Sequence, residues 1–140
     1  PTAGAVPSGA LLIAEEVTTG LGRTGRWFAC EHDAIVPDLL VIGKALGAGF
    51  PVAAVATTEA VDARCHGVVR HVQSHQNDPL SGRLAETVIA VLQAEGLVDA
   101  AAEKGRVLLA GLQDLQRRHA PVVDVRGKGL MLGVEVEVLL

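Results

Sequence analysis

The sequence is poor in aromatic residues, with one tryptophan, two phenylalanines and no tyrosine among 140 residues. Proteins that stack nucleic-acid bases on aromatic side chains need more of them. A basic surplus is also missing, because 12 lysines and arginines stand against 16 aspartates and glutamates, for a net charge of -4. Both shortages argue against a nucleic-acid-binding function.

Cysteines and long apolar runs are scarce as well. Cys30 and Cys65 are too few for a disulfide framework, so we expect reduced thiols and a cytoplasmic location. The cysteines and histidines include no C-x-x-C pair, so we expect no metal site. The apolar runs are far shorter than the ~20 residues of a membrane helix, and we expect no signal peptide. The abundant residues are hydrophobic, at 49%, which indicates a globular domain.

Three short apolar runs predict strands. Each run is continuous rather than alternating, which is typical of strands buried on both faces of a sheet. They occupy residues 11–14, 39–42 and 52–56. Thr58 is expected to cap a short helix that begins at Glu59.

The apolar spacing changes at Pro79, after which apolar residues recur every three or four positions and predict helix. Residues 95–96 interrupt this pattern, which then continues to the basic residues 117–119 and stops before Pro121. Two further strands, around a turn at 127–129, are predicted at residues 122–125 and 130–138. This order of strands, helices and two further strands predicts an α/β layer, followed by a second structural unit.

Two charged features stand at strand ends, where open α/β sheets bind ligands. Glu15 and Glu16 follow the first run, and a carboxylate there is desolvated unless it meets a cation or a ligand. The simpler alternative is that one glutamate pairs with an arginine and the other faces water. Lys44 follows the second run, and an amine held in an apolar pocket can attack a carbonyl to form a Schiff base. The simpler alternative here is a solvated side chain.

Residues 20–25 (GLGRTG) match the dinucleotide-binding pattern G-x-G-x-x-G. That pattern works when its first glycine directly follows a strand and its third opens a helix, and neither is predicted here. Nucleotide binding is thus the weaker interpretation, and a tight loop with positive φ angles is the better one.

Six segments that follow one another along the chain form one pattern: residues 11–17 (LLIAEEV), 20–25, 27–32 (WFACEH), 36–38 (VPD), 43–51 (GKALGAGFP) and 124–131 (DVRGKGLM). Together they resemble the core of class III aminotransferases, which are pyridoxal-phosphate enzymes of fold type I. The resemblance implies part of the large domain, with buried, mostly parallel strands and helices, running into the start of a small α+β domain. Residues 1–78 would belong to the large domain, 79–119 to bridging helices and 120–140 to the small domain.

The resemblance also assigns roles around the cofactor pyridoxal 5′-phosphate. Lys44 matches the lysine that forms a Schiff base with it, and Glu15 stands where the family has an aspartate that keeps the pyridine nitrogen protonated. Val17 matches the small apolar residue on one ring face, and Thr18 replaces a glutamine near a cofactor oxygen. Ser74 matches a hydroxyl that reaches the cofactor phosphate of the neighbouring subunit, which implies a homodimer or larger assembly.

The implied reaction is transfer of an amino group between an amine or amino acid and a 2-oxo acid. Asp78 and Pro79 stand where most members have Asn-Pro, as in the branch that resembles dialkylglycine decarboxylase, so a decarboxylating transaminase is a further option. Family members are much longer, and the resemblance implies a truncated chain. The alternative is a non-catalytic remnant that keeps the fold but lacks half the site.

Overall fold

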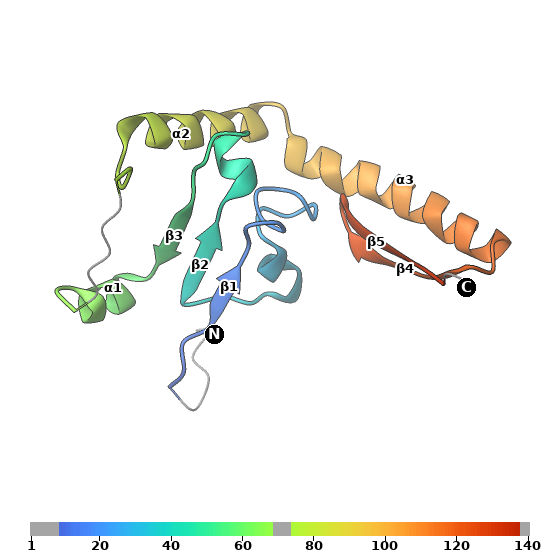
Figure 1. Cartoon of the computed structure of the whole chain (residues 1–140), viewed down its shortest axis with the longest axis horizontal. Coiled ribbons are helices and arrows are strands. Elements are labelled where there is room, and N and C mark those ends of the chain that lie inside the picture. Colours follow the sequence, from blue (N-terminus) through green and yellow to red (C-terminus); the bar gives the residue numbers. More distant parts are fainter. Residues whose placement is uncertain (1–8, 69–73, 138–140) are drawn as a thin grey trace.

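The computed structural model describes residues 9–68 and 74–137. Its first part is a three-stranded sheet of β1 (Ile13–Glu15), β2 (Leu39–Ile42) and β3 (Ala54–Thr57), in the order β1-β2-β3 (Figure 1). β1 and β2 are parallel, whereas β3 is antiparallel to β2, which the apolar runs did not reveal. The α/β expectation is confirmed, with strand ends displaced by one or two residues in β1 and β3.

Three α-helices follow the sheet. Helix α1 (Glu59–Cys65) begins after Thr58, whose side chain accepts a hydrogen bond from the Val61 N–H, as the sequence predicted. Helix α2 (Pro79–Ala94) is capped by Asp78, whose carboxylate accepts from Leu80 N at 2.9 Å. Helix α3 (Leu97–Arg118) starts after Gly96, whose φ of 60° explains why the helical pattern breaks there.

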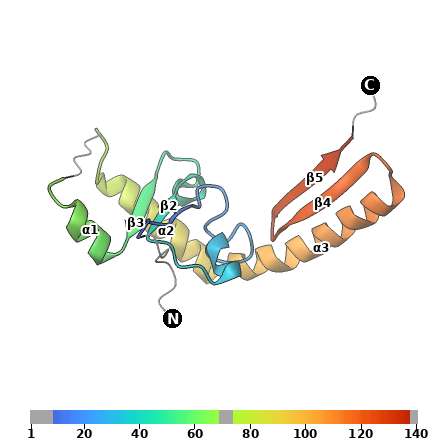
Figure 2. The same cartoon turned by 90° about the horizontal axis from the view of Figure 1, so that it is seen from below.

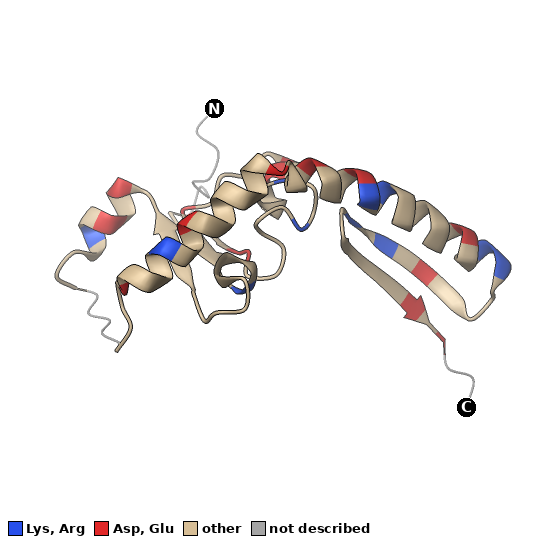
Figure 3. Ribbon diagram, turned by 90° about the horizontal axis from the view of Figure 1, so that it is seen from above, with Lys and Arg blue, Asp and Glu red and all other residues tan. Residues whose placement is uncertain are grey.

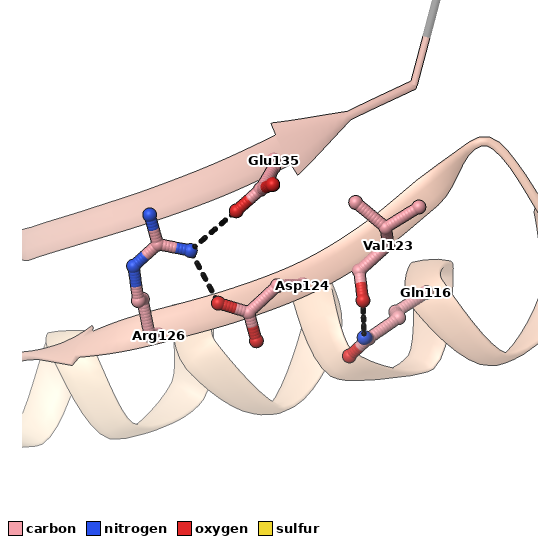
Figure 4. A network of polar contacts seen from close by, with 5 residues as sticks. All are labelled: Gln116, Val123, Asp124, Arg126 and Glu135. Carbon is pink, nitrogen blue, oxygen red and sulfur yellow. Dashed lines mark hydrogen bonds and ion pairs between the residues drawn. The ribbon is translucent and has the colours of Figure 1, made fainter.

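The chain ends in a hairpin of β4 (Val122–Lys128) and β5 (Met131–Val136), which packs on α3. Residue 138 of the predicted last strand lies outside the described residues. Figure 4 shows how polar groups hold this unit: the Arg126 guanidinium binds Asp124 and, at 3.0 Å, Glu135, while Gln116 Nε2 donates to Val123 O at 2.9 Å. Gln116 thereby connects helix α3 to the hairpin.

Helices α2 and α3 extend one after the other along one side of the molecule, with the sheet β1–β3 beside α2 and the hairpin beside α3 (Figures 1 and 2). Acidic and basic residues are interspersed along α3 and the hairpin (Figure 3). Among the described residues no helix is long and apolar enough to cross a membrane.

The expected burial of the first three strands is wrong for this chain. All β2 residues are only half-buried, and every β3 residue is exposed. In β1, the Ile13 side chain is 59% exposed. The physical reason is that α2 packs chiefly on η2, a 3-10 helix at Lys44–Gly47, and leaves the sheet faces largely uncovered by described residues.

Candidate functional site

The parallel pairing of β1 and β2 brings two chain segments together at one edge of the sheet. Glu15 is paired with Val41, so the residues that follow β1 lie beside those that follow β2. Val17 and Thr18 come from the first segment, and Lys44 comes from the second, at the start of η2. Four of the five residues proposed from the sequence therefore lie at the carboxyl ends of neighbouring strands.

Lys44 has an unusual backbone and a specific partner. Its φ is 44°, in the left-handed region that residues other than glycine seldom adopt. Its Nζ donates a hydrogen bond to Thr18 Oγ1, across 26 residues of sequence. The Lys44 side chain is exposed, so the apolar pocket proposed from the sequence is not formed by the described residues.

Gly43 allows the two segments to approach. A Cβ at position 43 would lie 3.3 Å from Val17 Cγ1, tighter than ordinary van der Waals contact. Val17 is half-buried against this glycine. The absence of a side chain at 43 thus lets the backbone that carries Lys44 pass directly beside Val17.

The two glutamates divide into an exposed and a buried one. Glu15 is exposed, and its Oε1 accepts a hydrogen bond from Val17 N at 2.7 Å, within its own turn. Glu16 is only 3% exposed. The simpler alternative from the sequence was that one glutamate faces water and the other pairs with an arginine. Its first half is confirmed, because Glu15 is exposed. Its second half is wrong, because Glu16 accepts hydrogen bonds from Thr19 and from Cys30 N instead.

Glu16 organises the turn from which Val17 and Thr18 project. Its Oε1 accepts from Cys30 N at 2.9 Å, its Oε2 accepts from the Thr19 hydroxyl, and its carbonyl accepts from Gly20 N at 2.9 Å. Burial by itself raises the pKa of Glu16, but these side-chain and backbone hydrogen bonds outweigh it and lower that pKa below its ordinary value. Burial and the negative charge of Glu16 raise the pKa of the Cys30 thiol.

The structural role of Glu16 is one that the sequence analysis missed. The signal available was two adjacent acidic residues at a strand end, and the alternation of side chains along a strand places them on opposite sides. Nothing in that signal says which of the two is enclosed, because the enclosing groups come from the 3-10 helix η1 (Ala29–Asp33) and its flank.

The glycine loop at residues 20–25 packs against the second unit. Leu21, Gly22 and Gly25 have positive φ angles of 55°, 88° and 84°, which confirms the tight-loop interpretation. A Cβ on Gly25 would lie 2.8 Å from Ala102 Cβ of α3, so this glycine permits backbone-to-helix contact. No helix opens at Gly25, and the dinucleotide-binding pattern therefore lacks its required context.

The hairpin turn contacts the same loop. Leu130 N donates to Arg23 O at 2.9 Å, and Lys128 Nζ lies 4.0 Å from an Asp33 carboxylate oxygen. A hollow of 990 Å³ lies between this loop, α3 and the turn, and Trp27 and Arg106 are among the residues that line it. Lys44 is not part of its lining, so this hollow is separate from the Lys44 cluster.

Ser74 is exposed and lies before the start of α2. In the described part of the chain, no hydrogen bond joins it to Lys44 or Thr18. The other four side chains are the amine of Lys44, the hydroxyl of Thr18, the branched apolar Val17 and the carboxylate of Glu15. These groups suit one side of a planar aromatic aldehyde such as pyridoxal phosphate.

Comparisons with known proteins agree with this arrangement. The family model of class III aminotransferases matches residues 5–138. An uncharacterized aminotransferase of Schizosaccharomyces pombe is 43% identical over 130 residues, covering 91% of this chain and 29% of the relative. An acetylornithine aminotransferase of Caldanaerobacter subterraneus is 37% identical over 127 residues, covering 91% of this chain and 32% of the relative.

A solved structure shows the same fold. The ornithine aminotransferase of Toxoplasma gondii, described with partial occupancy of PLP at its active site, superposes with a TM-score of 0.83. It is 36% identical, and the match covers 91% of this chain and 31% of that one. The chain spans about three tenths of the length of these relatives. Its fold is part of the fold type I transaminase fold, and the chain belongs to the class III aminotransferase family.

Proposed function

We propose that this chain carries the lysine half of a site for PLP-dependent transfer of an amino group between an amine or amino acid and a 2-oxo acid. The observation that supports this best is the conformation and environment of Lys44. Its backbone is left-handed, the preceding Gly43 lies beside Val17, and its amine donates a hydrogen bond to Thr18. Strained backbone of this kind clusters at functional sites, because neighbouring structure must hold it in place.

The proposed role of Lys44 is to hold the cofactor covalently and to move the proton at the substrate carbon. When bound, pyridoxal phosphate supplies an electron sink for that carbon. Val17 would pack on one face of the ring, and the carboxylate of Glu15 would face the pyridine nitrogen. Thr18 lies beside the amine, and Ser74 is proposed to reach the phosphate site of a neighbouring subunit in a homodimer or larger assembly.

The second candidate is a non-catalytic protein that keeps the fold. The exposure of Lys44 and the turning of the Glu15 carboxylate onto Val17 N favour it, because a working site encloses its amine and directs its carboxylate at the cofactor. Both candidates retain a reactive lysine at position 44, so they differ in turnover rather than in labelling.

Covalent trapping tests the assignment of Lys44 as the cofactor lysine, which both candidates share. The amine of Lys44 condenses with the aldehyde of pyridoxal phosphate and releases water, and borohydride then reduces the C=N bond to a stable secondary amine. Only three lysines are possible targets, since Lys104 and Lys128 are the others. We expect the mass-spectrometric adduct at Lys44, its loss in Lys44→Ala, and its retention in the control Lys104→Ala, whose exposed lysine lies on α3.

Turnover is then measured as 2-oxo acid released from an amino acid in the presence of an acceptor. An adduct at Lys44 with turnover supports the amino-transfer proposal, and an adduct without turnover supports the non-catalytic candidate. Equal labelling of all three lysines would overturn the assignment of Lys44 as the cofactor lysine.

A further inference from the structure

The contact between Lys44 and Thr18 is the one hydrogen bond between side chains of the two segments of the proposed site in the described structure. The Lys44 Nζ donates, and the Thr18 Oγ1 accepts. Within residues 9–68 and 74–137, no carboxylate lies within 4.0 Å of the Lys44 amine. The amine is therefore held by a neutral hydroxyl and not by a fixed negative charge.

A hydroxyl suits an amine that must gain and lose a proton. An ionised carboxylate only accepts hydrogen bonds, so it binds the ammonium form and opposes its deprotonation. The hydroxyl of Thr18 has lone pairs that accept from the ammonium and a proton that it can turn toward the lone pair of the neutral amine. It can hold both forms of Lys44 in one place.

Both partners of this contact are fixed by their surroundings. Thr18 lies in the turn that Glu16 ties down through Thr19, Cys30 N and Gly20 N. Lys44 opens η2, in which Leu46 is 5% exposed and its N–H donates to Gly43 O at 3.1 Å. The Thr18 side chain is β-branched and so has few rotamers, whereas the lysine stem is long and flexible. The threonine therefore sets the position of the lysine.

We propose that Thr18 is the positioning residue of Lys44, an inference that rests on the proposed function. Its hydroxyl selects one rotamer of the lysine side chain and presents the amine at the edge formed by β1 and β2. Thr18 acts through Lys44 in this proposal.

The test compares Thr18→Val, which replaces the hydroxyl by a methyl group of similar size, with Thr18→Ser, which restores a hydroxyl. The lysine side-chain NMR signals are assigned with the Lys44→Ala and Lys104→Ala variants, and the two Hε protons of an ordered lysine differ in chemical shift. We expect split Hε signals for Lys44 in the parent and in Thr18→Ser, and averaged signals in Thr18→Val. Lys104 on α3 provides the mobile reference in every sample.

A second readout is the rate of borohydride-stable adduct formation at Lys44 with pyridoxal phosphate, which should fall at least about tenfold in Thr18→Val and recover in Thr18→Ser. The matched control is Thr87→Val, which removes a hydroxyl bonded to Arg83 O on α2. If Thr18→Val does not fold, as judged by Trp27 fluorescence, Thr18→Ala removes the same hydroxyl without the branched chain.

The proposal and the proposed function can fail separately, because the NMR readout needs no cofactor. Averaged Lys44 signals in the parent, or split signals in Thr18→Val, would overturn the positioning role while leaving an adduct at Lys44 intact. Split parent signals that collapse in Thr18→Val, with no adduct in any variant, would support the pairing and refute the cofactor assignment.

Discussion

Replacing Glu16 by glutamine would keep the shape of the side chain and remove the charge around which the turn after β1 is built. The Glu16 side chain is buried, with 3% of its surface exposed. Its carboxylate oxygens accept hydrogen bonds from Cys30 N at 2.9 Å and from the Thr19 hydroxyl. A glutamine has one carbonyl oxygen for these two donors, so one charge-assisted bond is lost and the other becomes neutral.

The magnitude follows from the value of hydrogen bonds to charged groups, about 1.5–3 kcal/mol each. We expect Glu16→Gln to lower the free energy of unfolding by about 2 kcal/mol at neutral pH. The hydrogen bonds hold the pKa of Glu16 below its ordinary value of 4.5, so the folded chain binds this proton more weakly than the unfolded chain. The stabilisation is therefore present above the ordinary pKa and is lost as the pH falls through the lower, folded pKa.

The assay is urea denaturation followed by the fluorescence of Trp27, the single tryptophan. At pH 7 the variant should be less stable than the parent, and the difference should shrink as the pH falls below 4.5 and through the lower pKa of the folded carboxylate. Glu31→Gln is the matched control, because the Glu31 side chain is exposed and accepts from Phe28 N at 3.1 Å. Equal stability of Glu16→Gln and parent at pH 7, or a deficit that does not change with pH, would refute the reasoning.

Two further outcomes are expected. Gly105→Ala should destabilise the chain by about 1–3 kcal/mol in the same urea assay, because its Cβ would lie 2.1 Å from Gly129 O, whereas Gly111→Ala on the same helix, with nothing within 4 Å, should be neutral or stabilising. The chain should also associate, since Ile13 and Val55 on the sheet are 59% and 61% exposed and covering ~500 Å² of apolar surface is worth on the order of 12 kcal/mol. Light scattering should give a mass above that of the 14.5 kDa monomer, and a monodisperse monomer would contradict this.

The spacing of apolar residues predicted helices and strands well where neighbouring residues in the sequence determine them. The strand Leu39–Ile42 was predicted with its observed bounds, and the helical pattern broke where Gly96 has a positive φ. Burial was predicted poorly, because it depends on what packs above each face. A continuous apolar run such as Leu39–Ile42 reports the environment that the strand is suited to, and the described part of this chain does not supply it.

The site was predicted in part for the same reason. Motif spacing placed Lys44 and Thr18 after two strands, but the parallel pairing that joins them and the choice of Glu16 as the buried carboxylate are properties of the folded chain. The role of Gly25 was also inaccessible, because its partner Ala102 lies on a helix far along the sequence. Neither contact has a signal within one short window.

The position of the Lys44 amine depends on several neighbouring residues, beginning with Gly43. Gly43 lacks the side chain that would crowd Val17, which lets the end of β2 lie against the turn after β1. The close approach brings Thr18 within hydrogen-bonding reach of a lysine whose own φ is 44°. A lysine in that conformation is less stable than one in an extended strand, so the surrounding contacts must offset the difference. Glu16 contributes by fixing the turn that carries Thr18, since its buried carboxylate binds Cys30 N and the Thr19 hydroxyl. The charge that matters for the geometry of the lysine is therefore one residue beyond the carboxylate proposed to face the cofactor.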